Sequence, residues 1–67
     1  MNDAEREYLE ALKVDPKLGE AHNNLAVVYL SNGRYQEAQV EIDAAERAAF
    51  HVNPQLKEDL KKASAKR

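Results

Sequence analysis

An internal repeat constrains the fold of this 67-residue sequence more than any other feature. A stripe of small and apolar residues, spaced by four and then three, recurs 34 residues later. Its two copies are Ala4, Tyr8 and Ala11, and then Ala38, Ile42 and Ala45. These spacings place each stripe on one face of a helix. The offset then becomes 38, because Leu12–Pro16 recurs as Phe50–Pro54. Four extra residues are about one helical turn, which predicts a longer helix in the second copy.

Proline, glycine and asparagine divide the sequence into helices. Asp15-Pro16 ends the first helix, because the residue before a proline is pushed out of the helical region. Gly33 ends the second, since glycine readily takes the left-handed conformation of a C-terminal cap. Asn53 caps the last, with Pro54 at its first position. We therefore expect an all-α chain of four antiparallel helices, at about 3–14, 18–32, 35–52 and 54–64.

The stretch from His22 to Ala38 is the one complete helical hairpin in this pattern. Leu25 and Tyr29 lie four residues apart on one stripe, with the small Ala26 beside them. A small residue lets a second helix approach closely, and Ala38 is the small residue of the next helix. The pattern predicts that the pair packs through these four residues.

Length and composition limit the classes of function. A chain of 67 residues forms one small domain with a thin core. It has no cysteine to supply a disulfide or a thiolate metal site, so we expect a cytoplasmic protein. No apolar run approaches the roughly 18 residues of a membrane span. Residues 1–56 are acidic and 57–67 basic, which favours a charge suited to a helix C-terminus over a nucleic-acid site.

The repeat resembles the tetratricopeptide repeat, a pair of antiparallel helices with a period of 34 residues. The family pattern is Trp-x2-Leu-Gly-x2-Tyr, then Ala-x3-Phe, then Pro. Its counterparts in this sequence are His22, Leu25, Ala26, Tyr29, Ala38, Ile42 and Pro54. His22 thus replaces the aromatic residue and Ala26 the glycine.

This resemblance implies a fragment of an α-solenoid within a single domain, 1–67. Residues 3–16 would be the second helix of an incomplete repeat. Residues 18–53 would form a complete pair with an extended second helix, and 54–67 a capping helix with a basic tail.

Catalytic chemistry is not expected. His22 and His51 are far apart in sequence and have no partner at metal-ligand spacing. Glu37 and Glu41 share a helix face, but a solvated acidic face explains that spacing. There is no glycine-rich phosphate loop. We therefore expect a non-enzymatic protein without a metal or another cofactor.

Partner binding is the function that the resemblance implies. In such arrays the first helix of each pair lines a concave surface that binds peptides. The positions carried over to this sequence are Glu20, Asn23, Asn24, Val27, Leu30 and Ser31. The two asparagines would hydrogen-bond a peptide backbone, and Val27 and Leu30 would offer apolar contact. Chaperone-binding members carry basic residues where Glu20 and Asn23 stand, so a clamp for a C-terminal carboxylate is not expected.

Self-association is the alternative. Solenoids bury a continuous core by stacking, and about three repeats are usually needed for stability. The first helix would therefore have unmatched apolar surface around Tyr8, Leu9 and Leu12. We expect either a fragment of a longer array or a homodimer that forms through this open face.

Overall fold

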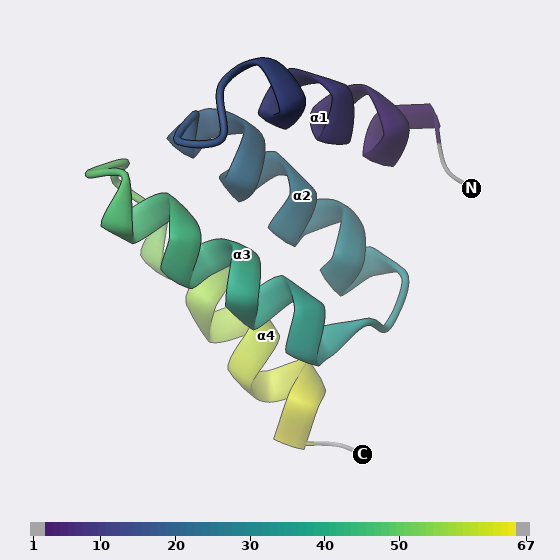
Figure 1. Cartoon of the computed structure of the whole chain (residues 1–67). Coiled ribbons are helices and arrows are strands. Elements are labelled where there is room, and N and C mark those ends of the chain that lie inside the picture. Colours follow the sequence, from purple (N-terminus) through teal and green to yellow (C-terminus); the bar gives the residue numbers. More distant parts are fainter. Residues whose placement is uncertain (1–2, 66–67) are drawn as a thin grey trace.

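The computed structural model describes residues 3–65, and within them the chain forms four helices (Figure 1). They are α1 (Asp3–Val14), α2 (Gly19–Ser31), α3 (Tyr35–Arg47) and α4 (Pro54–Ala65). Helix α2 packs between α1 and α3, and α4 packs against α3. The prediction of an all-α chain of four antiparallel helices is confirmed. None of the helices in residues 3–65 is long and apolar enough to cross a membrane.

The core lies between α2 and α3. Leu25, Ala26 and Ala38 have no exposed surface, and Tyr29 is 6% exposed, as the sequence pattern predicts. Ala26 and Ala38 have only a methyl group each, which lets the two helix backbones approach closely. The core cluster is completed by Ile42, Ala45, Val52 and Leu60.

The apolar residues of α1 are only partly covered by the rest of the described chain. Tyr8, Leu9 and Leu12 are half-buried and pack against the core cluster. The largest exposed fraction among the big apolar side chains of residues 3–65 belongs to Val14, at 88%. Of the predicted basic tail, residues 66 and 67 lie outside the described part of the chain.

One helix boundary was predicted wrongly. Helix α3 ends at Arg47, whereas the sequence pattern extends the helix to residue 52. Ala49 explains the difference, because its φ of 62° lies in the left-handed region and stops the helix. The four-residue insertion therefore lies in the loop 48–53 and does not add a helical turn.

Two backbone hydrogen bonds close the end of α3 in a Schellman motif. The Phe50 N–H donates to the Ala45 carbonyl at 3.0 Å, and the Ala49 N–H donates to the Glu46 carbonyl at 2.9 Å. Helix α2 ends in the same pattern of hydrogen bonds, with Gly33 at the left-handed position and a φ of 76°. The two helices thus end in the same capping motif, but α3 has an alanine at the left-handed position where α2 has a glycine.

The alanine at the left-handed position that ends α3 predicts that Ala49→Gly stabilises the protein. The left-handed conformation is unfavourable for alanine, and glycine adopts it freely. Glycine also raises the entropy of the unfolded chain, which reduces this gain. We therefore expect a net increase of about 0.5–1 kcal/mol in the free energy of unfolding. Urea denaturation measures it. The reciprocal variant Gly33→Ala should lose a similar amount, and equal stability of all three proteins would contradict the assignment.

Candidate partner-binding site

A hollow of about 430 Å³ lies between α2 and the start of α4. Its α2 wall consists of four residues for which the family resemblance implied a place on a concave binding surface, namely Asn23, Val27, Leu30 and Ser31. The opposite wall consists of residues at the start of α4, namely Asn53, Gln55, Leu56 and Asp59. The hollow therefore brings together two segments that are about 30 residues apart in the sequence.

Asn23 carries the clearest unsatisfied polar group of this hollow. Its side-chain oxygen is buried, and no donor within residues 3–65 reaches it. A buried acceptor without a donor costs about 1–3 kcal/mol, so such groups normally have a partner. Asn23 is half-buried and lines the hollow. Its side-chain carbonyl has almost no exposed surface, so it could accept a hydrogen bond from a molecule that enters there once the side chain turns toward the hollow.

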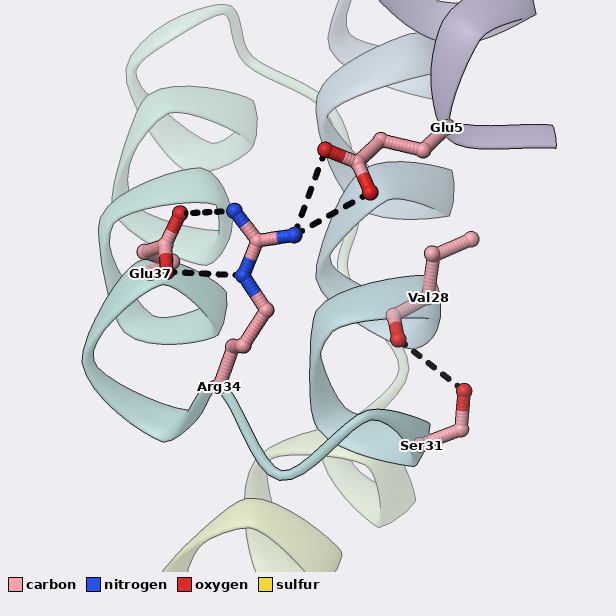
Figure 2. A network of polar contacts seen from close by, with 5 residues as sticks. All are labelled: Glu5, Val28, Ser31, Arg34 and Glu37. Carbon is pink, nitrogen blue, oxygen red and sulfur yellow. Dashed lines mark hydrogen bonds and ion pairs between the residues drawn. The ribbon is translucent and has the colours of Figure 1, made fainter. Parts of the chain in front are cut away.

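The other polar groups around the hollow already have partners. The Ser31 hydroxyl donates to the Val28 carbonyl at 3.0 Å (Figure 2), which leaves its oxygen as an acceptor. The Gln55 side-chain amide donates to Asp59 at 2.8 Å. The Gln55 backbone N–H donates to the Asn53 side-chain oxygen at 2.8 Å, which confirms Asn53 as the helix cap.

Apolar surface and negative charge complete the hollow. Val27 is 47% exposed, and Leu30 and Leu56 are half-buried against the core cluster. Asp59 is the charged residue among those that line the hollow. No lysine or arginine of residues 3–65 lines it, so a carboxylate would find no charge-assisted partner.

Two predicted contact residues lie outside the hollow. Glu20 is exposed and Asn24 is half-buried, and neither lines it. The residues of α4 were missed by sequence reasoning, which predicted the helix but not which of its residues would face α2. The Asn53-Pro54 signal for a helix start could have indicated them, because it fixes which end of α4 lies beside this hollow.

His22, at the position of the family's aromatic residue, joins three segments through hydrogen bonds. Its Nδ1 lies 2.7 Å from a carboxylate oxygen of Glu41 in α3, and its Nε2 lies 2.8 Å from the Pro16 carbonyl. Both partner atoms accept hydrogen bonds, so the doubly protonated imidazolium is the form that satisfies both. Its role is therefore structural, as a link between α2, α3 and the loop that precedes α2.

The environment of His22 raises its pKa above the ordinary value of 6.5. Burial acts in the lowering direction, but the hydrogen bonds to Glu41 and Pro16 and the negative charge of Glu41 outweigh it. The positive charge of Arg47 opposes the rise. The folded protein therefore binds this proton more tightly than the unfolded chain does.

The difference between the folded and unfolded pKa of His22 predicts that stability depends on pH. The contribution of His22 should be complete below pH 6.5, the unfolded value, and should be lost as the pH rises through the higher folded pKa. Urea denaturation at a series of pH values measures it. His22→Gln should flatten this dependence, whereas His51→Gln, at an exposed histidine, should keep it. Parallel curves for His22→Gln and the wild type would contradict the role given to His22.

Arg34 forms a second link, between α1 and α3 (Figure 2). Its Nε and terminal nitrogen donate to the two carboxylate oxygens of Glu37 at 2.8 and 2.6 Å. Its other terminal nitrogen lies 3.1 and 3.2 Å from the oxygens of Glu5, a buried residue of α1. The guanidinium also lies 4.5 Å from the centre of the Tyr29 ring. Hydrogen bonds from Arg34 lower the pKa of Glu37, which keeps that carboxylate charged.

These links separate the two carboxylates that share a face of α3. Glu37 binds Arg34 and Glu41 binds His22, so the pair does not converge on one point. Within residues 3–65 no group of three or more acidic, histidine or cysteine side chains is arranged to hold a metal ion. Glu37 and Glu41 therefore serve to connect helices.

Comparison with known proteins identifies the family. The family model described as tetratricopeptide repeat matches residues 7–40, just over half of the chain. This segment begins in α1, contains all of α2 and ends in α3. Searches of curated proteins and of solved structures found no match. The chain therefore belongs to the tetratricopeptide repeat family, whose repeats are protein-interaction modules.

Proposed function

We propose that this protein binds an extended peptide segment of a partner protein in the hollow between α2 and α4. The buried side-chain oxygen of Asn23, which has no donor in residues 3–65, is the observation that carries the proposal. A backbone N–H of a bound peptide is a suitable donor, because every residue except proline has one. The hydrogen bond would remove the cost of the unsatisfied acceptor in the free protein.

The lining of the hollow limits the chemistry of the peptide. An apolar side chain of the partner would contact Val27, Leu30 and Leu56 and remove their exposed surface from water. Asp59 disfavours a negative charge nearby and favours a positive one. The proposed ligand is therefore a neutral or basic peptide with at least one apolar side chain.

Selection from a library of displayed random peptides tests this proposal, because it requires no identified partner protein. Peptides that the wild-type protein enriches should bind Val27→Asp at least about tenfold more weakly, because a buried carboxylate would face the apolar side chain of the peptide. The matched control is Val40→Asp on α3, where the valine is 58% exposed and does not line the hollow. This control should bind as the wild type does.

Asn23→Ala gives a second, independent measurement. It removes the unpartnered oxygen of a residue that lines the hollow, so the affinity for the selected peptides should fall by about tenfold. Failure to enrich any peptide would contradict the proposal. Selected peptides that bind Val27→Asp and Asn23→Ala as tightly as the wild type would place the binding surface elsewhere.

A further inference from the structure

We infer that copies of this chain associate head to tail, with α1 of one copy packed against α4 of the next. The internal repeat makes α1 a counterpart of α3, and α4 a weaker counterpart of α2. Within the chain α2 and α3 bury their matching faces against each other. Helix α4 of one copy and α1 of another are thus the two halves of a pair like that of α2 and α3.

The incomplete burial of α1 identifies the first surface of the proposed interface. Ala38, Ile42 and Ala45 of α3 are 0%, 1% and 0% exposed. Their counterparts 34 residues earlier on α1, which are Ala4, Tyr8 and Ala11, all remain partly exposed. The same stripe that α3 buries completely against α2 is therefore incompletely covered on α1.

Helix α4 supplies the second surface of the proposed interface. A hollow of about 630 Å³ lies between α3 and α4, where Leu60 and Ser64 line it together with Tyr35. Ser64 is the counterpart, 38 residues later, of the fully buried Ala26 on α2, yet Ser64 is exposed. The position that α2 uses to contact α3 thus remains uncovered on α4.

The net charges of the two helices are opposite in sign. Helix α1 carries four acidic and two basic side chains, a net charge of −2. Helix α4 carries three basic and two acidic side chains, a net charge of +1. Two of these lysines, Lys57 and Lys61, line the hollow between α3 and α4. The charge difference favours the meeting of α1 with α4 and disfavours the meeting of two α1 faces.

The link between His22 and Glu41 identifies the acidic position on the corresponding face of α1. Glu41 lies on the buried stripe of α3 and reaches the basic His22 of α2. Its counterpart on α1 is Glu7, which is exposed and has no polar partner within residues 3–65. The counterpart of His22 on α4, 38 residues later, is the apolar Leu60, next to Lys61. In a head-to-tail stack Glu7 would therefore lie near Lys61, which forms no ion pair within residues 3–65 and lines the same hollow as Leu60. The stack would thus bring an acidic side chain of α1 near a basic side chain of α4, although not at the position that His22 occupies on α2.

This arrangement differs from a symmetric homodimer through the α1 face. A head-to-tail contact joins two different surfaces, so each added copy leaves one surface of each kind open unless a ring closes. The average mass should therefore grow with protein concentration beyond that of a dimer. It should fall as salt is added, because exposed charge pairs are screened.

Two charge-reversed variants test the inference by sedimentation equilibrium. Glu7→Lys blocks the α1 face and Lys61→Glu blocks the α4 face, and both residues are exposed, so the fold should persist. Each variant alone should associate about tenfold more weakly than the wild type, because like charges then meet. An equimolar mixture should regain association, since each variant supplies the face that matches the other.

The outcomes separate the two modes of assembly. A wild-type protein that stays monomeric up to its solubility limit would overturn the inference. Association of Lys61→Glu equal to that of the wild type would also overturn it, and would favour the symmetric contact through α1. A mixture that associates no better than the single variants would contradict the pairing of α1 with α4. Circular dichroism of each variant confirms that it is folded.

Discussion

Replacing Leu25 with alanine should lower the free energy of unfolding by about 2–5 kcal/mol. Leu25 is fully buried at the centre of the α2–α3 pair, so the substitution removes apolar burial and leaves a cavity. The whole chain is expected to have a stability of roughly 3–10 kcal/mol. A single substitution can therefore leave a large fraction of the protein unfolded. Urea denaturation followed by circular dichroism measures the loss.

The matched control for Leu25→Ala is Val40→Ala. Val40 lies on α3 but is 58% exposed, so its truncation should change the stability by less than about 0.5 kcal/mol. Similar losses in the two variants would mean that the core does not lie between α2 and α3. A Leu25→Ala protein with unchanged stability would contradict the burial of this side chain.

Gly19→Ala should destabilise the protein by about 1–3 kcal/mol, although alanine is the better helix former. Gly19 is buried at the first position of α2, where the loop after α3 passes close to it. A β-carbon there would lie 2.5 Å from the Phe50 β-carbon and 3.4 Å from the Ala48 β-carbon. The Phe50 β-carbon is bonded to the backbone, so a side-chain rotation cannot relieve the overlap. Thermal and urea denaturation measure the cost.

Glu20→Ala is the control for that substitution. It changes the next residue of the same helical turn, but Glu20 is exposed, so the effect should stay within about 0.5 kcal/mol. If helix propensity alone decided the outcome, Gly19→Ala would gain up to about 1 kcal/mol. A gain of that kind would show that the loop after α3 does not approach α2 as closely as described.

Much of the fold could be predicted from the sequence because the helix signals are local. Three helices agree with their predicted bounds to within one residue, and the stripe of Leu25 and Tyr29 is buried as expected. The end of α3 was missed because Ala49 gives no stop signal in the sequence. Alanine is a strong helix former, and its left-handed conformation depends on the packing of the following loop.

The candidate site was less predictable because it depends on tertiary contacts. The resemblance to the tetratricopeptide repeat implied that Asn23 and Val27 share a surface, and both line the hollow. Leu56 and Asp59 became part of it only through the placement of α4. In the same way, the ion pair between Glu5 and Arg34 joins residues 29 positions apart, and no sequence motif predicts it.

Chemical-shift mapping by NMR is the most direct test of the binding site. The probe is a peptide selected for binding to the wild-type protein, added stepwise to the labelled full chain. The largest changes should occur at Asn23, Val27 and Ser31 of α2, together with Leu56 of α4, because these residues line one hollow. Changes confined to α1 and the exposed face of α3 would contradict the proposed site.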